Sequence, residues 1–283
     1  MASFTNFATL SYNGGTTNSN IVTGEILEAL TAVKTAVSAN YSAGDRITYA
    51  LSLVNTGTAA ITDYTVTDNL GGYTVGANTV YPLAYNAGTV RYYINGVLQT
   101  APTVTAGPPL SVTGLTVPAG GNAVLIYETT ATPVAPLATG SSITNTATIT
   151  GGGLTTPITA QATVDTANSA DLTISKALSP TTVTENGRIT YTFVISNTGN
   201  TEATATGNVV VTDTIAPILR NIAVTYNGTA WTEGTNYTYN AATGVFTTLA
   251  GQITVPAASF TQNTDGTFTV TPGTATLVIT GTV

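Results

Sequence analysis

The chain has 283 residues, enough for two domains of ordinary size, and its net charge is −7 with few charged residues of either sign. It has no cysteine and no histidine, which excludes disulfides, thiol nucleophiles, imidazole bases and common zinc sites, so we expect no metal site, no cofactor and no enzyme. The six basic residues form no phosphate-binding cluster and no apolar run is long enough for a bilayer, which argues against nucleic acid and membrane insertion. Abundant Thr, Val, Gly and Asn favour an all-β chain.

The first residues of the chain resemble a segment far downstream. Residues 3–13 read SFTNFATLSYN, and residues 142–152 read SITNTATITGG, with the alternation of a closing β-strand. Aligning residues 3–17 with residues 142–156 gives eight identities in fifteen positions. We therefore expect residues 1–20 to form an extended donor strand whose inward face carries Phe4, Asn6, Ala8 and Leu10.

Two copies of one pattern fill the rest of the chain. Residues 25–34, EILEALTAVK, have helix-like apolar spacing, but their second half aligns with the first strand of the second copy, so we expect a linker and a strand. Residues 30–70 align with residues 172–215, and both contain short alternating strands separated by turn residues. This pattern predicts two tandem antiparallel β-sandwiches, at residues 21–165 and 166–283.

The two copies differ at their ends. The first copy closes with the strand at residues 142–150, whereas the second copy stops at Val283, in the strand equivalent to the one that ends near Ala131. We therefore expect the second sandwich to lack a closing strand, and the segment at residues 3–13 to supply one.

The order of Lys, ITYTFVISNTG, VVVTDT and ITNTAT resembles the bacterial surface-protein repeat family called domain of unknown function eleven. That family is similar to the immunoglobulin-like modules of Gram-positive adhesins and pili. The resemblance covers nearly the whole chain. It implies an immunoglobulin-like fold and a surface or structural setting, and it implies no ligand. We expect the chain outside the cell or on a cell or spore surface.

Strand parity predicts that three polar residue types face the core: lysine, aspartate and asparagine. Burial lowers the pKa of a lysine and raises that of an aspartic acid, so a neutral amine can attack a carboxamide that the acid polarises, with loss of ammonia. The resemblance to adhesin modules implies such an isopeptide bond within the subunit and one between subunits. The first would use Lys34, Asp68 and Asn145, and the second Lys176, Asp213 and Asn6 of another subunit. A buried Lys–Asp ion pair with Asn as a hydrogen-bond partner is the non-covalent alternative.

An unpaired strand position in one molecule and a spare strand in the next predict head-to-tail donation, which builds an open filament. We therefore expect a structural subunit of an extracellular fibre, pilus-like or spore-appendage-like, whose partner is the protein itself. The N-terminus has no secretory signal pattern, which leaves the export route open. Two alternatives remain: an arm that packs on its own domain or is disordered, and a surface adhesin or stalk whose loops bind a carbohydrate or host protein. Candidate sugar-binding aromatic residues are Tyr92, Tyr93, Tyr237 and Tyr239.

Overall fold

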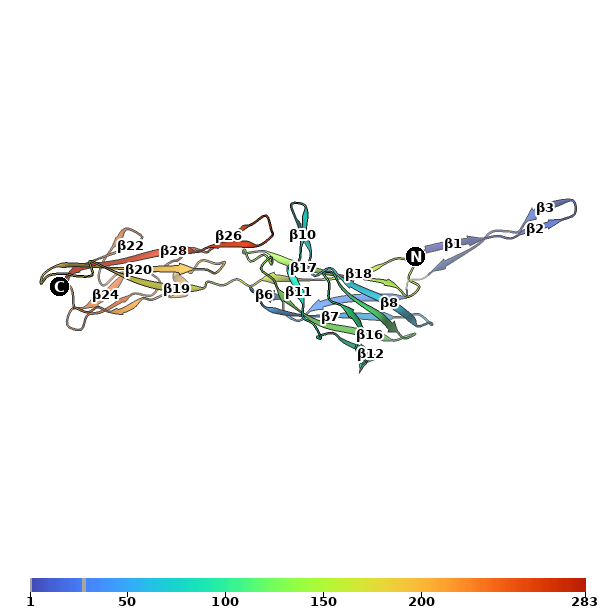
Figure 1. Cartoon of the computed structure of the whole chain (residues 1–283), viewed down its shortest axis with the longest axis horizontal. Helices are drawn as coiled ribbons and strands as arrows, with labels where there is room; N and C mark the ends of the chain where they lie inside the picture. The colour runs from blue at the N-terminus through green and yellow to red at the C-terminus, as the bar shows by residue number, and fades with distance from the viewer. Residues whose placement is uncertain (1, 27–28) are drawn as a thin grey trace.

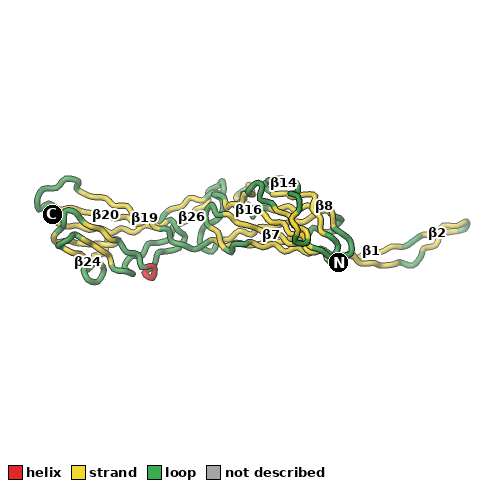
Figure 2. Tube along the Cα trace, turned by 90° about the horizontal axis from the view of Figure 1, so that it is seen from below, coloured by secondary structure: helices red, strands yellow, loops and turns green. Residues whose placement is uncertain are grey.

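The computed structural model describes residues 2–26 and 29–283, and it is an elongated molecule built almost entirely of β-strands (Figure 1). Residues 27 and 28, in the expected linker, lie outside the described residues. No helix in the described part of the chain is long and apolar enough to cross a membrane. The single 3-10 turn described, η1 (Ala205–Gly207), appears red in Figure 2 against the yellow strands. The prediction of an all-β chain with two tandem antiparallel sandwiches is confirmed.

An N-terminal ribbon of two antiparallel strand pairs projects from one end of the body (Figures 1 and 2). Its elements are β1 (Ala2–Asn6), β2 (Thr9–Tyr12), β3 (Gly15–Asn18) and β4 (Val22–Ile26), with β1 paired to β4 and β2 to β3. The strands are extended as expected, but they pair with each other instead of forming a single strand. Asn13 and Gly14 cause this difference, because Asn-Gly between two short strands favours a two-residue hairpin turn.

The first sandwich packs two six-stranded sheets around one core. The first sheet has the order β13-β12-β16-β7-β5, with β11 also paired to β16. Its strands are β5 (Leu30–Ala36), β7 (Arg46–Asn55), β11 (Leu83–Tyr85), β12 (Arg91–Ile94), β13 (Val97–Leu98) and β16 (Asn122–Ala131). Burial alternates along β7 because Ile, Tyr and Leu at every second position face the opposite sheet.

The second sheet of this sandwich has the order β14-β15-β8-β17-β18-β6. Its strands are β6 (Asn40–Tyr41), β8 (Ile61–Asp68), β14 (Thr103–Thr105), β15 (Leu110–Val117), β17 (Ser142–Gly151) and β18 (Ile158–Thr166). Strand β17 pairs with β8 on one side and with β18 on the other, and β18 lies alongside β5. A small hairpin of β9 (Tyr73–Val75) and β10 (Asn78–Val80) lies outside both sheets.

Five strands of the second sandwich repeat the main order of the first sheet, as β19-β20-β28-β22-β23. These strands are β19 (Leu172–Ser179), β20 (Arg188–Asn197), β22 (Arg220–Tyr226), β23 (Thr229–Trp231) and β28 (Gly273–Thr282). The facing sheet is only three-stranded, in the order β21-β25-β24, with β21 (Thr212–Thr214), β24 (Tyr237–Asn240) and β25 (Val245–Thr248). Its core includes Phe246, Leu277 and Ile279.

The two sandwiches meet through side-chain contacts as well as the connecting chain. A hairpin of β26 (Ser259–Gln262) and β27 (Phe268–Thr271) reaches back from the second sandwich, and the Gln262 amide donates to the Tyr73 hydroxyl at 2.8 Å. The Asn200 amide donates to two backbone carbonyls of the first sandwich and its connector, at Leu137 and Ala167. These contacts place the second sandwich at the end of the molecule opposite the N-terminal ribbon (Figure 1).

Candidate crosslinking sites and an open sandwich edge

The predicted first site forms around a buried ion pair between the two sheets. Lys34 lies on β5 of one sheet and Asp68 at the end of β8 in the facing sheet, and Nζ is 2.6 Å from Oδ2. Their side chains are 0% and 1% exposed. A lone buried lysine is costly, so this pairing explains how the core accommodates the charge.

Aromatic and backbone groups complete the surroundings of the pair. The Lys34 ammonium nitrogen lies 4.8 Å from the centre of the Tyr49 ring and 5.9 Å from that of Tyr127. The Tyr127 hydroxyl donates to Asp68 Oδ2, and the Leu70 amide donates to Oδ1 at 2.9 Å. Both oxygens of Asp68 therefore have partners. The contribution of Tyr127 was not expected from the sequence.

Burial changes the proton affinity of this cluster. It lowers the pKa of Lys34 to about 8, although the neighbouring Asp68 opposes the shift. At pH 7 an amine with this pKa is neutral roughly one time in ten, a much larger fraction than in water. Burial, reinforced by the charge of Asp68, raises the pKa of the Tyr49 and Tyr127 hydroxyls, so both remain neutral.

Asn145 belongs to the same buried cluster. It lies on β17, two positions before the residue that pairs with Asp68, so both side chains point to the same face of the sheet. Its amide is among the groups that oppose the rise in pKa of the Tyr49 and Tyr127 hydroxyls. The side chain is fully buried, yet neither Oδ1 nor Nδ2 has a hydrogen-bond partner among the described residues. Such an unpaired buried amide costs about 1–3 kcal/mol.

The second site has the same pair in a solvent-exposed setting. Lys176 Nζ on β19 lies 2.5 Å from Asp213 Oδ2 on β21, and the side chains are 38% and 18% exposed. The ammonium nitrogen lies 4.5 Å from the centre of the Tyr191 ring. Asn6, expected to complete this site, lies exposed on β1 of the ribbon, at the opposite end of the molecule (Figure 1). No described residue of the same subunit brings an asparagine amide to this pair.

The exposure of the second site follows from an open edge in its sandwich. In the first sandwich β8 is flanked by β15 and β17, whereas β21 pairs with β25 alone among the described strands. The adjacent face of β19 is exposed as well, with Ile174 at 55% and Leu178 at 41%. We call the unpaired side of β21 and this face of β19 the open edge. Unpaired strand groups beside exposed apolar side chains form a template for another strand.

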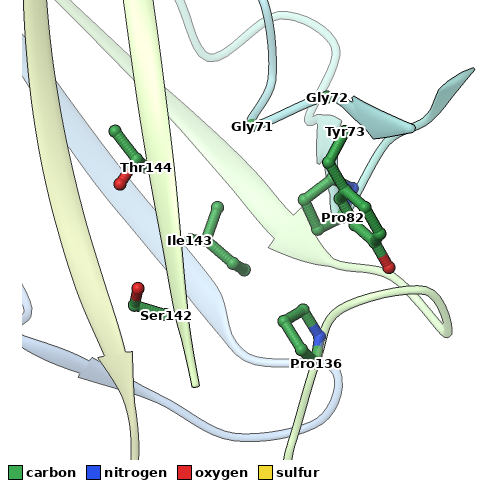
Figure 3. A pocket seen from close by; sticks show the side chains of 8 residues that line it. All are labelled: Gly71, Gly72, Tyr73, Pro82, Pro136, Ser142, Ile143 and Thr144. Atoms are coloured by element: carbon green, nitrogen blue, oxygen red, sulfur yellow. The ribbon is translucent and has the colours of Figure 1, made fainter. Parts of the chain in front are cut away.

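The tyrosines considered as sugar-binding candidates do not form a shared aromatic surface. Tyr92 and Tyr237 are core residues of the two sandwiches, which leaves only isolated members of the proposed sugar-binding pairs near the surface. A shallow pocket at the start of β17 is lined mainly by glycine, proline and small polar residues (Figure 3): Gly71, Gly72, Tyr73, Pro82, Pro136, Ser142, Ile143 and Thr144. Its single titratable side chain, Tyr73, donates to the Val134 carbonyl. This pocket therefore has no acid–base pair for catalysis.

Comparisons with known proteins give similarity at the level of solved structures. No family model matches the chain and no curated protein matches it, so membership of the family called domain of unknown function eleven stays a prediction. BcpA, the major pilin subunit of Bacillus cereus, is 14% identical over 96% of this chain and 73% of its own, with a TM-score of 0.35. The pilus backbone RrgB of Streptococcus pneumoniae is 14% identical over 86% of this chain and 55% of its own, with a TM-score of 0.36. The N-terminal domain of the Streptococcus gordonii adhesin Sgo0707 is 14% identical over 47% of this chain and 31% of its own, with a TM-score of 0.35. The chain thus spans about a third of that adhesin domain and about half of RrgB.

Proposed function

We propose that the protein is the structural subunit of an extracellular fibre that polymerises head-to-tail through its N-terminal segment. The observation that carries this proposal is that one molecule has an exposed β-segment at one end and an open edge at the other (Figure 1). Residues 1–20 act as the donor, residues 30–166 form the first sandwich, and residues 172–283 form the acceptor; the expected range 21–165 changes because β4 belongs to the ribbon and β18 ends at Thr166. The donor sequence resembles the strand that fills the equivalent position in the first sandwich.

The geometry favours donation between molecules over closure within one molecule. The ribbon and the second sandwich lie at opposite ends of the body, so an intramolecular closure requires the two sandwiches to fold back on each other. Such folding would break the contacts at Tyr73 and Asn200. A head-to-tail contact joins two different surfaces and repeats without closing, which produces a filament.

Within each subunit, we propose an isopeptide bond between Lys34 and Asn145. Transfer of the Lys34 ammonium proton to Asp68 leaves a neutral amine, which attacks Cγ of Asn145 while Asp68 gives that proton to the carboxamide oxygen. Asp68 then takes the proton that the attacking nitrogen must lose and passes it to Nδ2. The bond between Cγ and Nδ2 breaks, the carbonyl re-forms, and Nδ2 leaves as ammonia. Two features support this step: the lowered pKa of Lys34, and the buried Asn145 amide without a hydrogen-bond partner.

Between subunits, we propose the same reaction between Lys176 and Asn6 of the neighbour, with Asp213 in the role of Asp68. The Lys176–Asp213 pair is already formed on the open edge, and insertion of the donor would place a carboxamide beside it. Insertion would also shield the pair from water, a condition that favours the neutral amine.

The test is denaturing electrophoresis of assembled protein after boiling in detergent, with mass spectrometry of each band. We expect a ladder of multimers that collapses to monomer in the Asn6→Ala and Lys176→Ala variants and persists in the control Asn20→Ala, whose residue lies outside the aligned strand. The monomer band should lack the mass of one ammonia, and the Lys34→Ala variant should retain it. A single monomer band of full mass would refute both covalent bonds, and the absence of any filament by electron microscopy would refute the fibre.

A further inference from the structure

The N-terminal ribbon repeats both strands of the β17–β18 pair, although the sequence likeness covers only the part that matches β17. Three of four consecutive cross-strand pairs in the ribbon match the equivalent pairs of the first sandwich in chemical type, and the fourth has glycine in place of valine. A serine faces an acid, an apolar residue faces valine or glycine, threonine faces threonine, and asparagine faces a small apolar residue. The pairs in the first sandwich are Ser142↔Asp165, Ile143↔Val164, Thr144↔Thr163 and Asn145↔Ala162, and those in the ribbon are Ser3↔Glu25, Phe4↔Gly24, Thr5↔Thr23 and Asn6↔Val22.

The first sandwich shows which side of each pair faces inward. The Ile143–Val164 and Asn145–Ala162 pairs are buried, whereas the Thr144–Thr163 pair is on the outer side with its hydroxyls 2.9 Å apart. Residues directly opposite in an antiparallel pair share a face, so the matching inward face of the ribbon carries Phe4, Asn6 and Val22. The Phe4 ring lies over Gly24, where an added Cβ would be 2.4 Å from a ring carbon. Phe4 and Val22 are both more than half exposed in the subunit.

The open edge is wide enough for two strands. In the first sandwich, β17 pairs with β8 and β18 lies alongside β5; the equivalents of β8 and β5 are β21 and β19. On β5, Ala32 and Ala36 are half-buried beneath the neighbouring sheet. The equivalent residues on β19 are Ile174 and Leu178, which are exposed. A single added strand beside β21 would leave the face of β19 uncovered.

We infer that the occupant of the open edge is the whole N-terminal ribbon of a second copy of this chain, both strands together. Strands β1 and β2 pair with β21 in the place of β17, and β4 covers the face of β19 in the place of β18. Phe4 and Val22 become core residues of the second sandwich. This inference rests on the proposed function and adds that β4, a strand outside the aligned segment, is required for assembly.

The test compares aspartate substitutions on the two faces of the two strands in the full chain. We expect Phe4→Asp and Val22→Asp to abolish sedimenting filaments and Thr23→Asp to assemble like the unmodified protein. If Phe4→Asp blocks assembly and Val22→Asp does not, a single strand is donated, and the inference fails while the proposed function stands. If Phe4→Asp also assembles normally, the proposed function fails with it. Loss of assembly in Thr23→Asp would overturn the assignment of faces.

A crosslinking measurement keeps the inference testable if Val22→Asp disrupts the ribbon itself. Because the chain has no cysteine, each introduced thiol is unique. Protein carrying Val22→Cys is mixed with protein carrying Ile174→Cys and treated with a short bis-maleimide, in an Asn6→Ala background that removes the proposed amide bond. We expect a covalent heterodimer, and none when Val22→Cys is replaced by Val97→Cys, an exposed control on β13. Equal yields in the two mixtures would overturn the placement of β4 on β19.

Discussion

Replacing Asp68 with alanine should destabilise the first sandwich far more than replacing Asp213 destabilises the second. Both aspartates form an ion pair with the equivalent lysine at nearly the same distance, 2.6 Å and 2.5 Å. The difference between them is burial, since the first pair is enclosed and the second is partly exposed to solvent. The two variants therefore separate the effect of desolvation from that of the pair itself.

The magnitude follows from what each substitution leaves behind. Asp68→Ala leaves the Lys34 ammonium buried without a counter-ion, which costs about 3–5 kcal/mol. It also removes the acceptor of the Tyr127 hydroxyl and of the Leu70 amide, which adds to the loss in a non-additive way. Asp213→Ala leaves Lys176 able to reach water, and a partly exposed pair contributes at most about 1 kcal/mol.

Urea unfolding measures both changes in one molecule. Asn145→Ala and Asn6→Ala serve as a common background, so that no isopeptide bond contributes in any variant. Trp231, the single tryptophan, stacks on Tyr226 in the second sandwich, and its fluorescence reports that sandwich alone. Near-ultraviolet circular dichroism sums the packed aromatic residues of both sandwiches, so the part of its transition that does not follow Trp231 fluorescence reports the first, whose core holds Tyr49, Tyr64 and Tyr127. The reasoning is refuted if Asp68→Ala lowers the free energy of unfolding of the first sandwich by no more than Asp213→Ala lowers that of the second.

Three further predictions concern pH, a buried asparagine and the junction between the sandwiches. In the Asn145→Ala background, the pKa of Lys34 is about 8 in the folded state against 10.5 unfolded, so the unfolded state binds more protons between these values. Stability of the first sandwich should therefore rise from pH 8 to about pH 10, measured as the urea midpoint, and a flat profile would contradict the burial of an ionisable amine. Asn197→Ala removes a buried side chain that donates to the Thr201 and Pro256 carbonyls and accepts from two backbone amides. The urea midpoint of the second sandwich, followed by Trp231 fluorescence, should therefore fall by the equivalent of about 2–4 kcal/mol. An unchanged midpoint would show that water replaces these bonds. Gly266→Val places a side chain against Val80 at a backbone φ of +88°, so the β26–β27 hairpin should detach from the first sandwich. Small-angle scattering should then show a broader range of sandwich orientations. The control Thr261→Val should leave the scattering unchanged.

Much of the fold could be predicted because short, local patterns in the sequence indicate the strands. Alternation of apolar residues along segments such as ITYALSLV predicts strands directly, and the repeat of one pattern predicts two sandwiches. The Lys–Asp pairs could be predicted as well, because strand parity places both residues on inward faces. Both pairs form in the structure.

Other features depend on contacts between segments that carry no local signal. The hydroxyl of Tyr127 meets Asp68 from the opposite sheet, and its equivalent in the second copy is Ile279, so no repeat pattern marks it. The pairing of the N-terminal segment did carry a signal, the Asn13-Gly14 turn. The likeness of residues 3–17 to one strand predicts a single strand instead of a hairpin, and β4 has little sequence identity to β18 to reveal the match.

The ribbon that projects from the body is already folded before it meets another molecule. Its backbone groups are paired along β1–β4 and β2–β3, so the conformational entropy of ordering these residues is lost when the subunit folds. Docking such a preorganised element costs less than ordering a flexible peptide, and it leaves one outer edge of the ribbon free to meet β21. Association between subunits would then resemble the docking of two rigid bodies, with a rate set by collision and orientation instead of by folding.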